Sequence, residues 1–104
     1  MILPIYFEAA PATVSADDSN YTATSSLVFL GSGVDITLKD SEKVGTTVTF
    51  FCTTSTVDAV VTLTTKVSTS YDVINLAGNL SSVTVMWTPD GWNVINLSGQ
   101  VTFA

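Results

Sequence analysis

The stretch SVTVMWTPDGWNVINLSGQVTFA, residues 82–104, decides the fold class because it contains a complete β-hairpin. Its turn is Thr88-Pro-Asp-Gly91, in which proline presets the first turn position and glycine takes the left-handed conformation that follows. A turn of this type normally brings a one-residue bulge, which we expect at Gly91 and Trp92. The predicted pairs are then Trp87 with Asn93, Met86 with Val94, and Val85 with Ile95.

With this register both faces of the hairpin are apolar. One face carries Val83, Val85, Trp87, Ile95 and Leu97, and the other carries Thr84, Met86, Trp92 and Val94. A sheet with one face in water alternates more strictly between apolar and polar residues. We therefore expect either a fold that buries both faces or a second copy on one of them, and we predict Met86, Trp92 and Val94 as a subunit interface.

The segments upstream of the hairpin have the same β character. Short runs rich in Val, Thr and Phe alternate with turn residues, at Leu27–Leu30, 34–38, 46–52, 59–65, 72–76, 82–87, 92–97 and 100–103. Such regular spacing is typical of a sandwich or barrel, and no segment has a helical period. The prediction is an all-β domain at 27–104, an antiparallel β-sandwich or barrel-like (jelly-roll-like) fold of about eight short strands.

Residues 1–26 differ from the rest of the chain. They begin with an apolar tip, which comprises Ile2, Leu3, Ile5, Tyr6 and Phe7, and continue with small polar residues. Pro4 and Pro11 exclude a long helix in this region. We therefore predict an extended N-terminal arm whose tip pairs with its own sheet or anchors to a neighbouring subunit.

Charge and hydropathy restrict the possible partners. The chain has 104 residues, 46% of them hydrophobic and only 12% charged, and its net charge is −6 with three Lys or Arg residues. Nucleic acid and anionic membrane surfaces both require clustered basic residues, so neither is expected as a partner. So few charges in so apolar a chain favour a surface that is buried in an assembly, or alternatively a β domain whose surface is mainly Thr and Ser.

The chemistry-bearing residues do not form an evident active site. The chain has no histidine, and its single cysteine, Cys52, lies in an apolar run and is interpreted as a small buried hydrophobe. Asp35, Asp40 and Glu42 surround one turn, where solvated carboxylates are the default and calcium is the alternative. We predict no enzyme activity, no cofactor and no metal.

Aromatic residues near the turns allow one further hypothesis. The candidates for a sugar-stacking platform are Trp87, Trp92, Tyr21, Tyr71 and the Phe residues, although aromatic residues beside a hairpin turn more often pack in a core or an interface.

Three segments together resemble a β-rich module of tailed-bacteriophage virion proteins. They are TTVTFFC at 46–52, DAVVTL at 58–63, and SVTVMW at 82–87 followed by GWNVI at 91–95. The resemblance covers about residues 38–104, and its most distinctive part is the tryptophan, the short turn and the Gly-Trp pair. Modules of this kind occur in capsid decoration proteins and at the tips of fibres.

The resemblance implies a virion structural protein. Decoration, or cement, proteins are similar in size and bind the exterior of an assembled capsid, commonly as trimers. We therefore expect a homotrimer that is made in the host cytoplasm and contacts the major capsid protein or other virion proteins. The alternatives are a receptor- or glycan-binding fibre tip and a small bacterial or prophage binding module outside any virion.

Overall fold

The computed structural model describes residues 10–52, 57–65 and 72–103. It is all-β, and the described residues contain no helix. The strands are β1 (Ala12–Val14), β2 (Asp18–Tyr21), β3 (Leu27–Leu30), β4 (Asp35–Leu38), β5 (Thr47–Cys52), β6 (Ala59–Leu63), β7 (Val73–Thr88) and β8 (Gly91–Phe103). The predicted all-β class is therefore confirmed.

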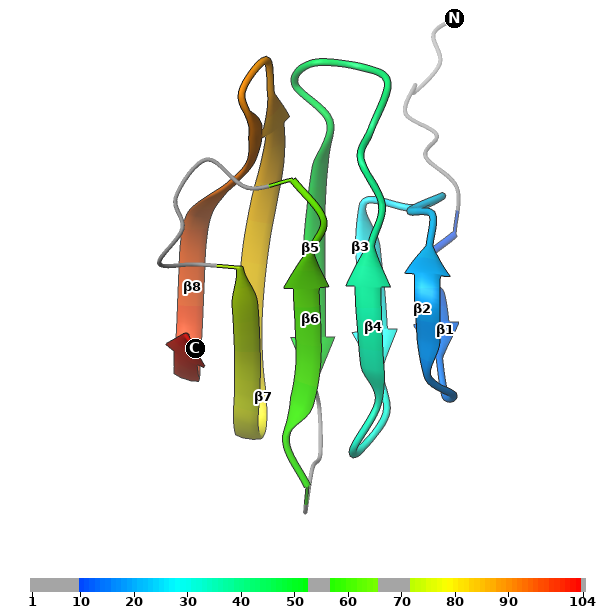
Figure 1. Cartoon of the computed structure of the whole chain (residues 1–104). Coiled ribbons are helices and arrows are strands. Elements are labelled where there is room, and N and C mark those ends of the chain that lie inside the picture. Colours follow the sequence, from blue (N-terminus) through cyan, green and yellow to red (C-terminus); the bar gives the residue numbers. More distant parts are fainter. Residues whose placement is uncertain (1–9, 53–56, 66–71, 104) are drawn as a thin grey trace, which may run out of the picture.

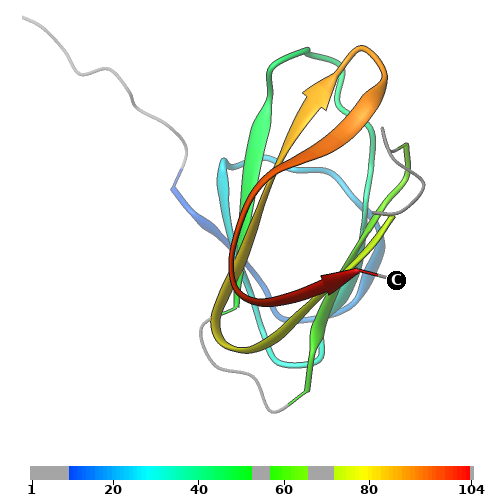
Figure 2. The ribbon, with the colours of Figure 1, turned by 90° about the vertical axis from the view of Figure 1, so that its left-hand side faces the viewer.

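The strands form one curled sheet in the order β1-β3-β5-β7-β6-β4-β2, and β8 pairs with β7. Strand β7 is shared, because its first part pairs with β6 and its second part with β5. The sheet curls so that the half containing β1, β3 and β5 faces the half containing β2, β4 and β6 (Figures 1 and 2). We call them the odd half and the even half.

The sheet is mixed, whereas the sequence predicts an antiparallel one. Strands β1, β3 and β5 are parallel to one another, as are β2, β4 and β6, and only the pairs that involve β7 are antiparallel. The reason is that successive strands up to β6 alternate between the halves. Each strand therefore pairs with the next but one along the chain, in the same direction, and this parallel pairing does not occur in a jelly roll.

The core lies between the two halves. Inward positions of the odd half form a row across the sheet that includes Val28, Phe50 and Val83, all of them fully buried. In the even half the corresponding row is Ile36, Val61 and Ile74. These are β-branched or aromatic side chains, which pack well on a pleated surface.

The predicted division at residue 26 is wrong in part. Strands β1 and β2 belong to the sheet, where they pair with β3 and β4. The sequence pattern does not predict these two strands, because Ala12–Val14 and Asp18–Tyr21 are short, consist mainly of small or polar residues and show no clear alternation. The apolar tip, comprising Ile2, Leu3, Ile5, Tyr6 and Phe7, lies outside the described residues.

The hairpin turn forms where predicted, but its bulge lies elsewhere. Gly91 has a φ of +126°, and the Thr88 hydroxyl donates a hydrogen bond of 2.8 Å to the Gly91 carbonyl. Trp87 pairs with Trp92 and Val85 with Val94, while Thr84 pairs with Asn96, so the extra residue is Ile95. The predicted pairs between 85–87 and 93–95 are therefore displaced by one residue.

Strands β7 and β8 both bend as they pass from one half to the other (Figure 2). At the bend, Gly99 has a φ of +80° and lies so close to β7 that a Cβ would be 2.9 Å from the Ser81 Cα. The buried Ser81 hydroxyl donates to the Ala77 carbonyl at 2.7 Å and accepts from the Gln100 N–H at 3.1 Å. The bend therefore satisfies its buried polar atom and requires glycine at position 99.

Candidate functional site

The displaced bulge moves two of the three predicted interface residues into the core. Trp92 and Val94 pair with Trp87 and Val85, which are inward residues. Trp92 is 2% exposed, and Val94 is half-buried against the core. Met86 points outward, opposite Thr47. The three residues therefore do not share a face, and the apolar surface predicted from them is not present.

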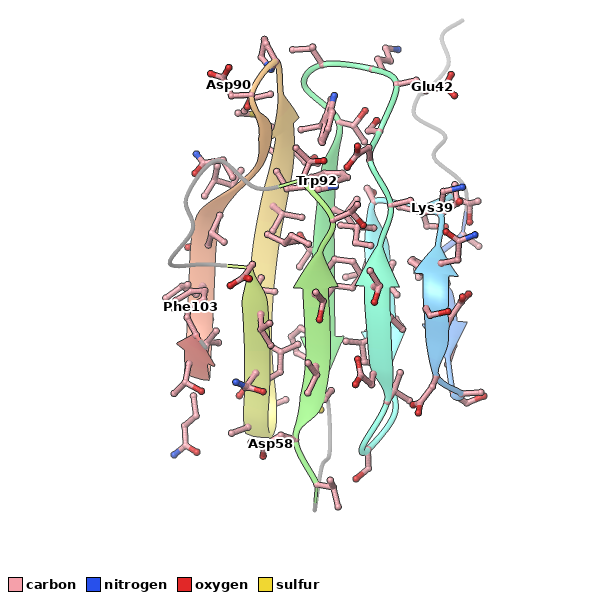
Figure 3. All side chains as sticks on the ribbon, viewed as in Figure 1. Lys39, Glu42, Asp58, Asp90, Trp92 and Phe103 are labelled. Carbon is pink, nitrogen blue, oxygen red and sulfur yellow. The ribbon has the colours of Figure 1, made fainter. Side chains whose placement is uncertain are left out.

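Trp92 connects the two halves of the sheet. Its indole N–H donates a 3.0 Å hydrogen bond to the carbonyl of Lys39, which directly follows β4 in the even half. Its ring lies edge-on to Trp87, with centroids 5.3 Å apart. Figure 3 places Trp92 within the body of the domain. A ring this buried cannot stack on a sugar, so Trp92 is removed from the proposed glycan platform.

A shallow hollow of about 340 Å³ lies beside Trp92, in the turn after β4. Its lining includes Lys39, Asp40, Glu42 and Lys43, so charges of both signs are present (Figure 3). Asp40 accepts a hydrogen bond of 3.0 Å from the Thr65 hydroxyl. In the described part of the chain, no three Asp, Glu or Cys residues gather to hold a metal, and the calcium alternative at this turn therefore gains no support.

The outward surface of the odd half is the candidate site, and we call it the neutral face. It is made of the outward residues of β1, β3, β5, β7 and β8, which are Thr13, Leu27, Phe29, Thr47, Thr49, Phe51, Ser82, Thr84, Met86, Asn93, Asn96 and Ser98. None of these residues carries a charge. In a chain with a net charge of −6, such a surface is suited to a partner that offers no ionic contacts.

Two aromatic rings lie at the centre of the neutral face. Phe29 and Phe51 are paired across β3 and β5, with ring centroids 6.0 Å apart and planes at 81°. Both are only half-buried, although their chain neighbours Val28 and Phe50 are fully buried. Beside them the Thr49 and Thr84 hydroxyls are 2.8 Å apart and hydrogen-bonded. The rings therefore lie on an ordered outer surface and are not part of the core.

A second apolar surface lies at the end strand, and we call it the β8 flank. Ile95 and Leu97 are 47% and 46% exposed, and with Val94, Asn96 and Phe103 they line a hollow of about 300 Å³. Leu97 continues the inward row of Phe50 and Val83, but it lies on the last strand of that row, where core packing is incomplete. Figure 3 shows Phe103 on this side of the molecule.

The opposite end of the sheet is polar. Strands β1 and β2 have three and four residues, and carboxylates of this region cap backbone groups. Asp17 accepts from the Asp35 N–H and Asp18 from the Asn20 N–H, both at 2.9 Å. Burial, and secondarily the Asp18 charge, raise the pKa of Tyr21. Short strands and charged residues are common at sheet edges that stay in water.

The sequence contains a signal for the neutral face outside the hairpin. Leu27–Leu30 and the Phe50-Phe51 pair are continuous apolar runs, which place large side chains on both faces of a strand. The pattern that predicts two apolar faces for the hairpin therefore also occurs in β3 and β5. Cys52, interpreted as a buried hydrophobe, is indeed fully buried.

Comparison with known proteins does not add a family. No protein-family model matches the sequence, and no curated protein is similar to it. Among the described residues there is also no helix with the length and apolar character needed to cross a membrane.

Proposed function

We propose that this chain is a non-enzymatic structural protein of a tailed-phage virion that decorates or cements the outer capsid surface as a homotrimer. The proposal rests on the sequence resemblance and is supported by the distribution of charge. Apart from Asp18 and Asp35, each the first residue of its strand, the charged residues of the described part lie in connections between strands.

This distribution suits a building block that packs side by side with other protein surfaces. Burying an unpaired charge is costly, so surfaces that become buried in an assembly tend to lack charges. The neutral face meets this condition without any change of conformation. In the proposal, the two facing halves act as the layers of a β-sandwich and present their outer faces to neighbours, and the segment 1–7 ties the trimer to the shell or to an adjacent subunit.

The fibre-tip alternative has less support. It depends on exposed aromatic side chains, and Trp92 is buried. Phe29 and Phe51 form a half-buried pair on the neutral face, and the Thr49 and Thr84 hydroxyls beside them are hydrogen-bonded to each other at 2.8 Å. A sugar site normally combines stacking with several polar groups placed for the ligand.

The test is co-sedimentation of the purified chain with heads of the encoding phage from which the protein has been removed. We expect binding that saturates at a fixed ratio to the capsid protein. A matched variant with Ile5→Asp and Phe7→Asp should remain folded and bind less, because it loses the apolar tip. A wild-type chain that stays in the supernatant at every concentration would remove the decoration role.

A further inference from the structure

We propose that Asp90 is a modification site, where the link from Asp90 to Gly91 slowly isomerises to isoaspartate, and that the Thr88 hydroxyl restrains this reaction. The three residues belong to the turn region between β7 and β8. The reaction needs only the chemistry of this turn, so it is independent of the proposed role in a virion.

Asp90 differs from the other aspartates and asparagines in the residue that follows it. Among all of these residues in the chain, only Asp90 precedes a glycine. Isomerisation begins when the backbone nitrogen of the next residue approaches the aspartate side chain, and a side chain on that next residue hinders the approach. Glycine has no Cβ and permits close approach of the backbone. The sequence therefore favours the reaction at this one position.

The reaction balances with water as its only other reactant. The Gly91 nitrogen attacks Cγ of the protonated Asp90 carboxyl group, a C–N bond forms, and the carboxyl hydroxyl leaves as water with the proton of that nitrogen. The resulting cyclic succinimide then takes up water at the main-chain carbonyl of Asp90. This step breaks the original peptide bond and leaves a free α-carboxylate. The product has the same atoms, but its main chain runs through the Asp90 side chain.

The carboxyl group of Asp90 is accessible. Pro89 and Asp90 are both exposed, and Figure 3 shows Asp90 at the tip of the β7–β8 hairpin. Within the part of the chain that the structure describes, the hydrogen bond at Asp90 is donated by its backbone N–H and leaves the carboxylate unengaged. The side chain can therefore turn toward the adjacent peptide without breaking a contact of its own.

The Thr88 hydroxyl holds the reacting peptide on both sides. It accepts a hydrogen bond of 3.2 Å from the Asp90 N–H and donates one of 2.8 Å to the Gly91 carbonyl. The Gly91 nitrogen can reach the Asp90 side chain only if the backbone between these two bonded groups rotates, and both hydrogen bonds oppose that rotation. Loss of the hydroxyl should therefore accelerate the reaction.

The conformation of the turn explains why the reactive pair is present. Gly91 has a φ of +126°, which L side chains rarely adopt, and a Cβ at this position would lie 3.0 Å from the Thr65 backbone. The hairpin therefore needs a glycine after Asp90. The product should disturb the same region, because its longer main chain adjoins the 2.8 Å hydrogen bond from the Trp92 N–H to the Thr65 carbonyl.

Incubation of the folded chain in warm neutral buffer tests the site. Isoaspartate is quantified by labelling with an isoaspartate methyltransferase, and its position is determined by electron-transfer fragmentation in a mass spectrometer. We expect the wild type to accumulate isoaspartate at Asp90. Asp90→Glu should accumulate none, because glutamate would have to close a larger ring. The modified fraction should unfold at a lower temperature than the unmodified chain.

Variants of Thr88 test the restraint. Thr88→Val removes the hydroxyl but keeps the shape of the side chain, and it should accelerate isomerisation several-fold, whereas Thr88→Ser should react at the wild-type rate. Thr84→Val is the matched control, because it removes a hydroxyl that is hydrogen-bonded to Thr49 at 2.8 Å but lies outside the turn. This control should leave the rate unchanged. Near-ultraviolet circular dichroism of the two tryptophans reports whether each variant is folded.

The opposite results would overturn the inference. A folded wild type that gains no isoaspartate while a synthetic peptide of residues 86–95 does would exclude the site, and isoaspartate at a different aspartate would exclude its assignment to Asp90. An unchanged rate in Thr88→Val, or equal acceleration by Thr84→Val, would exclude the restraint by Thr88. Binding to phage heads is measured separately, so its failure leaves these outcomes unaffected.

Discussion

The two halves of the curled sheet share one core but present different outer faces. The odd half exposes paired phenylalanines, Leu27 and Met86, whereas the strands of the even half expose mainly smaller side chains, such as Val60 and Thr62, and the carboxylates of Asp18 and Asp35. Inside, both halves contribute fully buried aliphatic residues. Folding alone requires only the inner rows to be apolar. The large apolar side chains on the outer face of the odd half therefore indicate a use beyond folding.

Phe50 and Phe51 are chain neighbours on opposite faces of β5, so replacing each in turn separates the contribution of the core from that of the outer face. Phe50 has the largest expected effect on the free energy of unfolding. Phe50→Ala should lower the free energy of unfolding by about 3–5 kcal/mol, because it leaves a cavity in the core. Phe51→Ala should cost about 1 kcal/mol, the value of a cross-strand pair, while weakening self-association. Urea denaturation of dilute protein measures both values, and equal losses would mean that Phe51 is a core residue.

Gly99 tests whether the bend that joins the halves is as constrained as the structure indicates. Gly99→Ala should cost about 2–5 kcal/mol, since it adds left-handed strain to a clash with the Ser81 backbone. Gly45→Ala is the matched control, because Gly45 also has a positive φ, +93°, but no atom lies within 4 Å of an added Cβ. Its expected cost is about 1–2 kcal/mol, and similar losses in thermal unfolding would contradict the close approach at Gly99.

The hydrogen bond between Trp92 and Lys39 connects the halves more weakly. Trp92→Phe keeps an aromatic ring but removes the indole N–H donor to the Lys39 carbonyl. We expect a loss of about 1–3 kcal/mol, as for a buried acceptor left without its partner, measured by urea denaturation. Trp87→Phe is the control, because within the described residues the Trp87 indole N–H donates no hydrogen bond across the halves. An equally large loss of unfolding free energy in Trp87→Phe would assign the effect of Trp92→Phe to ring size.

The smallest effect concerns pH and the edge of the even half. Burial and Asp18 raise the pKa of Tyr21 above its ordinary 10.0, so the folded chain holds the phenolic proton more tightly than the unfolded chain. This contribution to stability is complete below pH 10.0 and is lost as the pH rises through the raised pKa. Across this pH interval the free energy of unfolding, measured by denaturation, should fall more steeply for the wild type than for Tyr21→Phe. Parallel decreases in the two proteins would show that Tyr21 makes no pH-dependent contribution to stability.

Local sequence pattern predicted most of the strands but not how they are arranged. Strands such as β5 and β6 alternate clearly between buried and half-buried residues, so their positions were predictable. Whether successive strands pair or alternate between two halves depends on long-range contacts that alternation does not encode. Strand β1 has only three residues, and it forms because its backbone pairs with the free edge of β3.

The candidate site was predictable in kind but not in position. An uncharged surface was expected from composition, and Met86 does lie on the neutral face. Trp92 and Val94 were misplaced because Val94 and Ile95 are both β-branched residues that suit either face, so the pattern does not show where the bulge occurs. Because the bulge lies at Ile95 and not beside the turn, the residues of β8 between the turn and Ile95 face the opposite side from the predicted one.

The position of β7 in the sheet restricts the order in which the strands can pair while the chain is being synthesised. Parallel partners β1, β3 and β5 extend outward from β7, as do β2, β4 and β6, yet β7 is made after all of them. The β7–β8 hairpin is the most local pairing in the domain and the natural nucleus. The two halves can therefore be joined only once β7 has been made, so the sheet is completed against the direction of synthesis.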